Sequence, residues 1–543
     1  MMHINHFADS LRYNLTEYSH TDYYPFHMPG HKRAELEFPN PWSIDITEID
    51  GFDNLHHAEG ILKKLQEDAA FLFGARQSFC LVNGSTCGLL AAISACVRPG
   101  GKLLMSRNCH KAAYHGVYLR NITPVYVMPE PAAFGIMGSL APEAVELALK
   151  EQPDIEAVLV VSPTYDGVVS DIKRIAKIAH AHGIPLIVDE AHGAHFPFRN
   201  GCRKTAPGSL PEGHLEGHLK EHLEGHLEEQ PDTEKRSGYF PVSALFCDAD
   251  VVIQSLHKTL PAFTQTALLH VNSDLATEAS LRRFLGIYQS SSPSYLLMAS
   301  MDQCMQIIRT DGSRLFAALR KNLDDFYSSC DSLQYIQVFR GQERGSSALF
   351  DWDDSKILIS AARLGLSGQE LYDILLNRYH LQLEMAAGHY VLALATLMDR
   401  AEGFERLFAA LSQIDKSFHK NTQKGNFKDT ETVKGDDIRP RIMENVKPAH
   451  ASLNSVDFYR IPAQRMTPAE AFLLPSRKVP LKDSLGAVSQ EYLYLYPPGI
   501  PLIAPGEVID ETLLAHIREI QKAGLHLEGL EDITNTRIKV VDD

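Results

Sequence analysis

Residues 56–275 alternate short apolar runs with longer amphipathic stretches, and this alternation restricts the possible folds more than any other feature. Seven runs of four to six residues are rich in Val, Ile and Leu: Phe79–Val82, Leu103–Ser106, Val125–Met128, Ala157–Val161, Pro185–Asp189, Val251–Gln254 and Thr266–Val271. Such runs are typical of parallel strands buried on both faces. Helix-like stretches occur between them, among them Glu59–Phe73, Gly88–Cys96, Pro142–Lys150 and Ile172–His182. The sequence therefore predicts an α/β fold whose mostly parallel, seven-stranded sheet binds its ligand beyond the carboxyl ends of the strands.

Changes in composition divide the chain into five parts. They are an N-terminal arm (1–55), a large α/β domain (56–299), a smaller α/β domain (300–415), a polar linker without periodicity (416–450) and a C-terminal domain (451–543). At 543 residues the chain is long enough for several domains of ordinary size.

The large domain contains an insertion at residues 203–238 with a four-residue tandem repeat. Its histidines are His214, His218, His222 and His226. A helix would align them on one face, where they could bind a transition metal. We favour an expanded surface loop, because glycine recurs and leucine is the main side chain available for burial.

The formal net charge of −16 argues against nucleic acid and anionic lipid as partners, since both need clustered Lys and Arg. Residues 212–234 hold eight acidic residues and one lysine, so −7 of this charge lies in the insertion. Charge is therefore weak support for a cationic substrate.

Targeting and membrane signals are not apparent in the sequence. The first 24 residues are polar, and no run approaches the ~20 apolar residues of a membrane helix. The eight cysteines are scattered and form no Cys-x-x-Cys motif. This pattern favours reduced thiols over disulfides or a zinc site, and we expect a cytoplasmic protein.

A lysine follows the strand predicted at Val251–Gln254, in the segment Ser255–Lys258. Burial at a strand end would lower the pKa of Lys258 and leave its amine free to form an imine. Ser255 and His257 could hold an anion nearby. Taken alone, this motif is also compatible with a surface lysine in a loop.

An aspartate ends the strand predicted at Pro185–Asp189 and is followed by Ala191 and His192. A buried carboxylate needs a cationic or hydrogen-bonding partner, and a protonated pyridine nitrogen is one such partner. The alternatives are a loop cap or a metal ligand beside His192, although His192 and His195 alone cannot complete a metal site.

Two further segments follow predicted strands. Asn83–Gly88 has small residues, including Ser85 and Thr86, that let backbone amides approach a phosphate at a helix N-terminus; a plain helix cap is the alternative. His110, in the segment Arg107–Lys111, could stack on a planar ring, or could be a loop histidine satisfied by its neighbours. Together, the four segments describe a pocket for pyridoxal 5′-phosphate (PLP).

The sequence resembles the Orn/Lys/Arg decarboxylase family of fold-type-I PLP enzymes, which have the aspartate-aminotransferase-like fold. The segments that carry this resemblance are Phe26–Lys32, Asp45–Glu48, Asp53–His56, Asn83–Thr86, Arg107–Lys111, Pro163–Gly167, Asp189–Gly193, Ser255–Lys258 and Tyr496–Pro501. They cover roughly residues 20–415 and 451–543, in the family's order. The chain is more similar to the shorter branch of the family, which has no N-terminal receiver-like domain.

The resemblance implies a role for each candidate residue. Lys258 would bind PLP covalently, Asp189 would keep the pyridine nitrogen protonated, and His110 would stack on the ring. The phosphate would be held by Ser85, Thr86, Ser255 and His257. Ala191 and His192 would line the other face of the ring. One departure is Ala112, where this branch usually has Ser after the His-Lys pair.

The resemblance also implies a partner and a reaction. Ser290–Tyr295 is similar to a segment that reaches into the neighbouring subunit's site, so we expect a homodimer or a larger homo-oligomer. The expected reaction is decarboxylation of arginine, lysine or ornithine to the amine of polyamine metabolism. Glu491 or Glu507 could bind the distal cation of the substrate, although Glu507 is equally well explained as a turn residue.

Two other interpretations remain open at this stage. Another fold-type-I reaction, such as transamination, would use the same cofactor pocket. A non-catalytic paralogue with the same fold is less compatible with the presence of both Lys258 and Asp189.

Overall fold

The computed structural model describes residues 10–200, 239–423, 459–496, 499–522 and 526–542. The histidine repeat at 203–238 and most of the linker predicted at 416–450 lie outside these ranges.

A seven-stranded sheet forms the centre of the molecule, in the order β2-β9-β8-β7-β5-β3-β4. Its strands are β2 (Gln77–Leu81), β3 (Lys102–Ser106), β4 (Thr123–Val127), β5 (Ile155–Val161), β7 (Leu186–Asp189), β8 (Val251–Gln254) and β9 (Ala267–Val271). β9 is antiparallel to both of its neighbours, and the other pairs are parallel. The predicted mostly parallel sheet is confirmed, and each strand end lies within two residues of its predicted position.

Helices cover both faces of this sheet because successive side chains of a buried strand point to opposite sides. On β5, Ala157 and Leu159 pack into one core while Val158 and Val160 pack into the other. The first core lies under α4 (Gly84–Cys96), α5 (Lys111–Leu119) and α10 (Glu278–Tyr288). The second lies under α3 (Ile61–Phe73), α6 (Pro142–Glu151), α7 (Ile172–Ala181) and α11 (Tyr295–Ser329).

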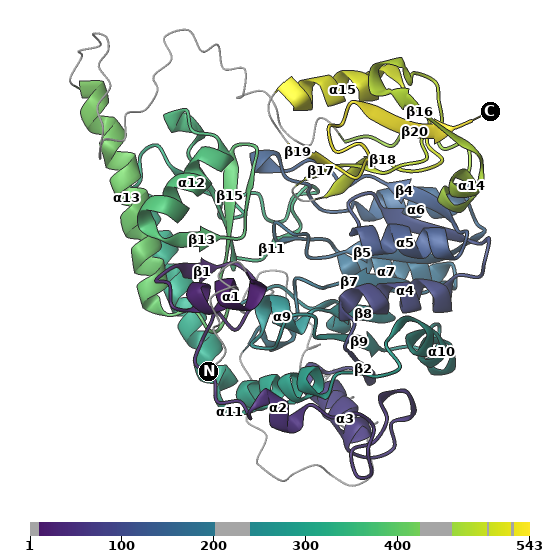
Figure 1. Cartoon of the computed structure of the whole chain (residues 1–543), viewed down its shortest axis with the longest axis horizontal. Coiled ribbons are helices and arrows are strands. Elements are labelled where there is room, and N and C mark those ends of the chain that lie inside the picture. Colours follow the sequence, from purple (N-terminus) through teal and green to yellow (C-terminus); the bar gives the residue numbers. More distant parts are fainter. Residues whose placement is uncertain (1–9, 201–238, 424–458, 497–498, 523–525, 543) are drawn as a thin grey trace, which may run out of the picture.

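A smaller antiparallel sheet follows α11 in the chain and lies to the left of the large sheet in Figure 1. Its strands are, in order, β10 (Gln337–Val338), β12 (Lys356–Ser360), β15 (Tyr390–Leu394) and β14 (Met385–Ala387). Two helices accompany it, α12 (Gly368–Tyr379) and α13 (Ala401–Gln423). α1 (Leu11–Ser19) and β1 (Tyr24–Phe26) belong to the N-terminal arm, and β1 pairs in parallel with β13 (Leu381–Leu383). The arm is therefore attached to the part of the chain that carries the small sheet.

Helix α13 continues to Gln423, into the linker predicted at 416–450. The sequence 404–423 contains neither glycine nor proline, so nothing in it stops a helix that Leu407, Leu411 and Ile414 already anchor by burial. The last turns of α13 therefore overlap the linker predicted from residue 416, whose start stays a prediction. The other domain boundaries stay predictions.

We call residues 459–542 the C-terminal unit. It contains α14 (Pro468–Leu473), β16 (Ser476–Pro480), β17 (Leu493–Tyr496), β18 (Ile500–Ile503), α15 (Glu511–Lys522), β19 (His526–Glu528) and β20 (Arg537–Val541). These elements enclose an apolar core of their own. Figure 1 shows the unit in yellow above α5 and β4 of the large sheet.

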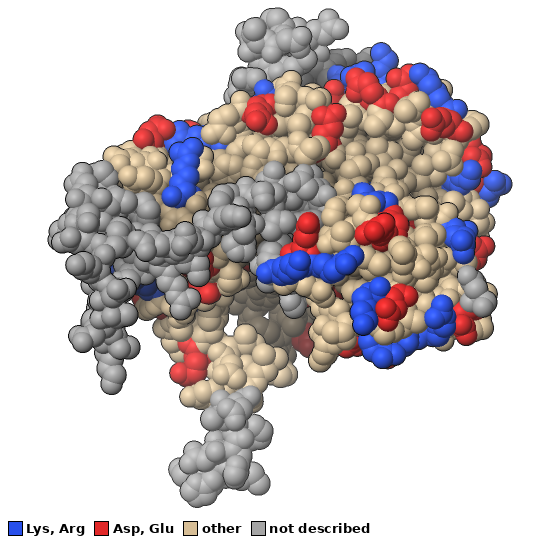
Figure 2. All heavy atoms as spheres, turned by 90° about the horizontal axis from the view of Figure 1, so that it is seen from above, with Lys and Arg blue, Asp and Glu red and all other residues tan. Residues whose placement is uncertain are grey.

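Charged side chains of both signs are mixed over the face seen in Figure 2. Within the described ranges, no helix combines the length and the apolar character that crossing a membrane requires. The described cysteines are all free thiols.

Candidate functional site

The candidate residues meet at the carboxyl ends of β7 and β8, beside the N-terminus of α4. Ser85 Oγ lies 2.9 Å from Ser255 Oγ, although 170 positions separate them. Lys258 Nζ lies 2.9 Å from His192 Nε2. Two independent contacts thus join segments that the sequence placed at separate strand ends.

Lys258 lies on α9 (Leu256–Thr259), a single helical turn that begins where β8 ends. The backbone amide of Gly30 donates to the carbonyl of His257 at 2.6 Å and fixes this turn. Burial lowers the pKa of Lys258, and Asp189 and Glu384 oppose this shift. A lowered pKa increases the fraction of neutral amine, which is the form that attacks a carbonyl carbon.

Asp189 is the last residue of β7 and is 5% exposed. Its Oδ1 accepts the backbone amide of Ala191 at 3.1 Å. Burial raises the pKa of Asp189, while Lys258 lowers it. A cation placed against this carboxylate would favour its ionised form, as a protonated pyridine nitrogen would.

The first turn of α4 can hold an anion. The helix begins at Gly84, so Ser85 and Thr86 lie inside it rather than before a helix starting at Gly88, as the sequence analysis expected. Asn83 gives this helix no side-chain cap; its Oδ1 accepts the backbone amide of Ser290 instead, at 3.0 Å. The first amides of α4 therefore lack the side-chain acceptor that commonly satisfies a helix N-terminus.

The other two candidate rings lie at helix starts. His110 caps α5, because its Nδ1 accepts the amide of Ala112 at 3.2 Å, and part of the residue is exposed, although burial still lowers the pKa of its imidazole to about 4. His257 Nδ1 pairs with the carbonyl of Thr266 at 2.9 Å. Ala112 is buried in the apolar core under α5, an environment that suits alanine better than serine.

The structure brings a further carboxylate to the site that sequence reasoning missed. Glu384, between β13 and β14, accepts the hydroxyl of Tyr165 and, at 2.8 Å, the amide of Met28. The Tyr165 ring in turn lies 4.7 Å from the His192 ring. No local motif marks Glu384, because its strands are short and join the site only through the tertiary fold.

A buried cation behind His192 was also missed. Lys356 Nζ donates to the carbonyl of His192 at 3.3 Å and lies 3.0 Å from Asp353 Oδ2. Asp353 also pairs with His195 at 3.3 Å, so the His195 ring contacts this carboxylate.

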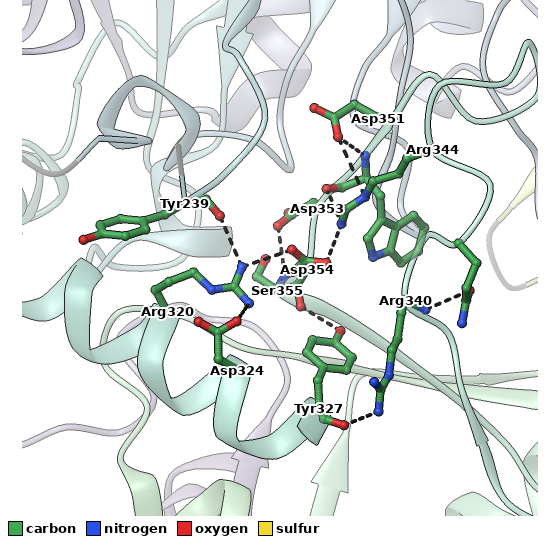
Figure 3. Close-up of polar contacts among 12 residues, drawn as sticks. Tyr239, Arg320, Asp324, Tyr327, Arg340, Arg344, Asp351, Asp353, Asp354 and Ser355 are labelled. Atoms are coloured by element: carbon green, nitrogen blue, oxygen red, sulfur yellow. Dashed lines mark hydrogen bonds and ion pairs between the residues drawn. The ribbon is translucent and has the colours of Figure 1, made fainter. Parts of the chain in front are cut away.

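The turn that carries Asp353 is anchored to α11. Its neighbour Asp354 pairs with Arg344 and, at 3.0 Å, with Arg320 of α11 (Figure 3). Tyr327 donates to the carbonyl of Asp354 at 2.9 Å. These contacts hold Asp353 and Lys356 in place beneath His192.

The two carboxylates expected to bind a substrate cation are already occupied. Glu507 forms a bidentate ion pair with Arg107, at 2.5 and 2.9 Å. Glu491 accepts the backbone amides of Glu531 and Lys539, at 2.7 and 2.6 Å. The expectation that either binds substrate is wrong, because both carboxylates are buried and turned toward partners of their own.

The segment Ser290–Tyr295 lies against the N-terminal arm. Tyr295 donates to the carbonyl of Asp53 at 2.6 Å, and His56 Nε2 lies 2.9 Å from the carbonyl of Ser290. Its predicted reach into a neighbouring subunit stays a prediction.

Several buried polar atoms near the site have no hydrogen-bond partner, among them His192 Nδ1, Thr259 Oγ1 and Asn108 Oδ1. Together with a buried carboxylate, an amine of lowered pKa and an uncapped helix start, they form a donor and acceptor set that fits PLP.

Comparison with known proteins agrees with this geometry. Residues 10–208 and 241–346 match the major domain of the Orn/Lys/Arg decarboxylases, and residues 451–537 match their C-terminal domain. The arginine decarboxylase of Halalkalibacterium halodurans is 30% identical over 527 residues, covering 95% of this chain and 94% of that protein.

Solved structures share the fold. The Francisella novicida lysine decarboxylase superposes with a TM-score of 0.71 at 19% identity, covering 98% of this chain and 80% of that one. An alanine–glyoxylate aminotransferase from Nostoc gives 0.52 at 13% identity, covering 73% and 96%. The predicted aspartate-aminotransferase-like fold is confirmed.

Proposed function

Because the chain belongs to the Orn/Lys/Arg decarboxylase family, we propose that it uses PLP to remove the α-carboxylate of arginine, lysine or ornithine as CO₂. The chain is an amino-acid decarboxylase. The observation that supports this reaction best is the meeting of Lys258, Asp189 and His192 at one sheet edge, beside the start of α4.

When bound, PLP supplies a protonated ring that accepts the electron pair released as the Cα–carboxylate bond breaks. Lys258 would hold the cofactor covalently through Nζ, and Asp189 would hold the proton on the ring nitrogen. His110 would cover one face of the ring, and Ala191 and His192 the other.

The phosphate would be bound where the start of α4 meets α9. Its ligands would be Ser85, Thr86, Ser255 and His257, together with the first backbone amides of α4. After CO₂ leaves, Nζ of Lys258 or Nε2 of His192 would return a proton to Cα. The 2.9 Å contact between these two atoms allows either to carry it.

We propose that Glu384 binds the distal cation of the substrate. Its carboxylate accepts the Tyr165 hydroxyl and the Met28 amide but stays partly exposed, and it acts electrostatically on Lys258, whereas Glu491 and Glu507 are buried. The product would be agmatine, cadaverine or putrescine, which are polyamines or their precursors. The name of the Halalkalibacterium relative favours arginine.

We also propose a cytoplasmic homodimer. Trp42 is 90% exposed, Ile49 is exposed, and so is Phe52, whose ring lies beside that of Tyr295, so a second copy has apolar surface to cover. Mixing a Lys258→Ala chain with a chain altered at Ser290–Ser292 should restore part of the activity if each site uses both subunits. Failure to complement would refute the shared site.

The test of the function is release of labelled CO₂ from carboxyl-labelled arginine, lysine and ornithine by the PLP-loaded protein. We expect one of the three to be turned over with formation of the matching amine. Keto-acid formation without CO₂ would instead indicate an aminotransferase. A protein that remains colourless with PLP would indicate a non-catalytic member of the family.

A further inference from the structure

A buried ion pair joins the C-terminal unit to the loop that carries His110. Arg107 and Glu507 have side chains that are 0% and 1% exposed, and 400 positions separate them. Burial would lower the pKa of Arg107, but Glu507, together with Tyr114 and Tyr126, outweighs burial and raises it. Both charges therefore persist inside the protein only while they remain paired.

Each end of this ion pair is fixed by further contacts. Glu507 Oε2 accepts the amide of Ala504 at 2.7 Å, so the carboxylate is held by its own turn. The Arg107 guanidinium lies 4.6 Å from the centre of the Tyr126 ring. The backbone carbonyl of Arg107 accepts the hydroxyl of Tyr114 at 2.6 Å, which connects the loop to α5.

The C-terminal unit also packs against α5, the helix that His110 caps. The Phe472 ring of α14 lies 5.0 Å from the Tyr118 ring, and Thr467 Oγ1 donates to Asn121 Oδ1 at 2.7 Å. The Arg107–Glu507 ion pair thus fixes the loop before α5, and the contacts of Thr467 and Phe472 fix the end of α5. Figure 1 shows the C-terminal unit above this helix.

We propose that Glu507 is a positioning residue for His110: through Arg107 it sets the loop that places the His110 ring against the cofactor. This inference rests on the proposed function, in which His110 covers the PLP ring. If Glu507 loses its charge, Arg107 becomes a buried cation without a counter-ion. The guanidinium then turns toward water and moves the loop between Arg107 and His110.

The test is a double-mutant cycle with Glu507→Gln and His110→Ala, read out as the dissociation constant for PLP and as thermal stability. The glutamine amide retains an oxygen for the Ala504 amide but removes the charge and one of the two acceptors that Arg107 uses. We expect Glu507→Gln to weaken PLP binding on the order of tenfold when His110 is present and to have no further effect in the His110→Ala chain. The loss of thermal stability should be the same in both backgrounds.

Several outcomes would overturn the proposal. Equal weakening of PLP binding in both backgrounds would show that Glu507 acts without His110, and an unchanged dissociation constant would show that it does not position the ring. If His110→Ala alone left PLP binding unchanged, the proposed role of His110 would fail, and this inference with it.

A second readout needs no cofactor. In the apoprotein, Glu507→Gln should increase hydrogen exchange at residues 108–113, whereas Glu531→Gln should not, because Glu531 forms an exposed ion pair in the same unit. If the single variant does not fold, the neutral pair Arg107→Met with Glu507→Gln leaves no unpaired buried charge and should keep wild-type exchange at residues 108–113. Increased exchange in that pair would show that an unpaired Arg107 is not what moves the loop and would overturn the proposal.

Discussion

The Nζ atom of Lys258 lies 2.9 Å from Nε2 of His192, across 66 positions of sequence. The two residues follow β7 and β8, which are neighbours in the sheet. Burial lowers the pKa of both, so the amine and the imidazole share a tendency to be neutral. A proton placed between them is therefore held weakly, which suits a lysine that must act both as a nucleophile and as an acid.

Lys258→Ala should abolish covalent attachment of PLP. Borohydride reduction of the loaded wild-type protein should fix the cofactor on the peptide that contains Lys258, as peptide mass spectrometry can detect, and the variant should show neither the adduct nor CO₂ release. Lys150→Ala is a matched control because this lysine is exposed and paired with Glu146. Retained turnover in Lys258→Ala would assign the chemistry to another lysine.

Asp189→Asn should lower kcat by roughly 10²–10⁴-fold while PLP still binds, because the amide preserves the shape of the side chain but not its charge. The effect should appear in kcat rather than in KM, since Asp189 is buried and, in the proposed function, contacts the cofactor ring and not the distal end of the substrate. Steady-state CO₂ release measures both constants. Wild-type kcat in the variant would exclude Asp189 as the partner of the ring nitrogen.

Glu384→Gln should raise KM for the basic amino acid about 10–100-fold, because one charge-assisted contact to the distal cation is lost. The amide oxygen can still accept the Tyr165 hydroxyl or the Met28 amide, so the fold should persist. A neutral substrate analogue of the same length is the control. If the variant loses the same factor with both substrates, Glu384 does not recognise the charge.

The carboxyl-end cluster was predictable because its members all follow strands that are recognisable as continuous apolar runs. Asp189, Ser255 and Lys258 needed no long-range information beyond strand order. The partners of Glu507 and Glu491 were not predictable, since they depend on how the C-terminal unit packs and on pairs as distant as Arg107 and Glu507.

The other residues and the helix start that the sequence did not predict were missed for a similar reason. Glu384 lies between two three-residue strands, where neither run length nor alternation is informative, and Lys356 is the first residue of β12. The early start of α4 was missed because Gly84 and Ser85 are poor helix formers. Gly84 has a φ of 73°, and its backbone turns the chain from the strand directly into the helix.

Gly30→Ala should disturb α9, the helical turn that carries Lys258. A Cβ at this position would lie 2.6 Å from the carbonyl oxygen of Leu260, which is backbone and cannot move aside cheaply. We expect weaker PLP binding and a loss of roughly 1–3 kcal/mol in unfolding free energy. The control is Gly286→Ala, on an exposed face of α10 where the nearest atom is 3.9 Å away; it should be neutral or slightly stabilising. Wild-type behaviour of Gly30→Ala would show that α9 tolerates displacement.

Stability should decrease as the pH rises through the titration of Glu190, which is buried next to Asp189. Its carboxylate accepts Ser243 Oγ, the Ala244 amide and Gln254 Nε2 at 2.6, 2.7 and 2.6 Å. Burial nevertheless raises the pKa of Glu190 from its ordinary value of 4.5 to about 7. Between these values the native protein retains a proton that the unfolded chain has lost.

The Glu190 contribution to unfolding free energy is therefore fully present below pH 4.5 and is lost by about pH 7. Urea unfolding of the apoprotein across this window should show a decrease of roughly 1–3 kcal/mol that is missing in Glu190→Gln, which cannot titrate. Glu67→Gln, an exposed carboxylate on α3, should keep the wild-type slope. The same slope in Glu190→Gln and in the wild type would mean that Glu190 is ionised throughout and that its three donors outweigh its burial.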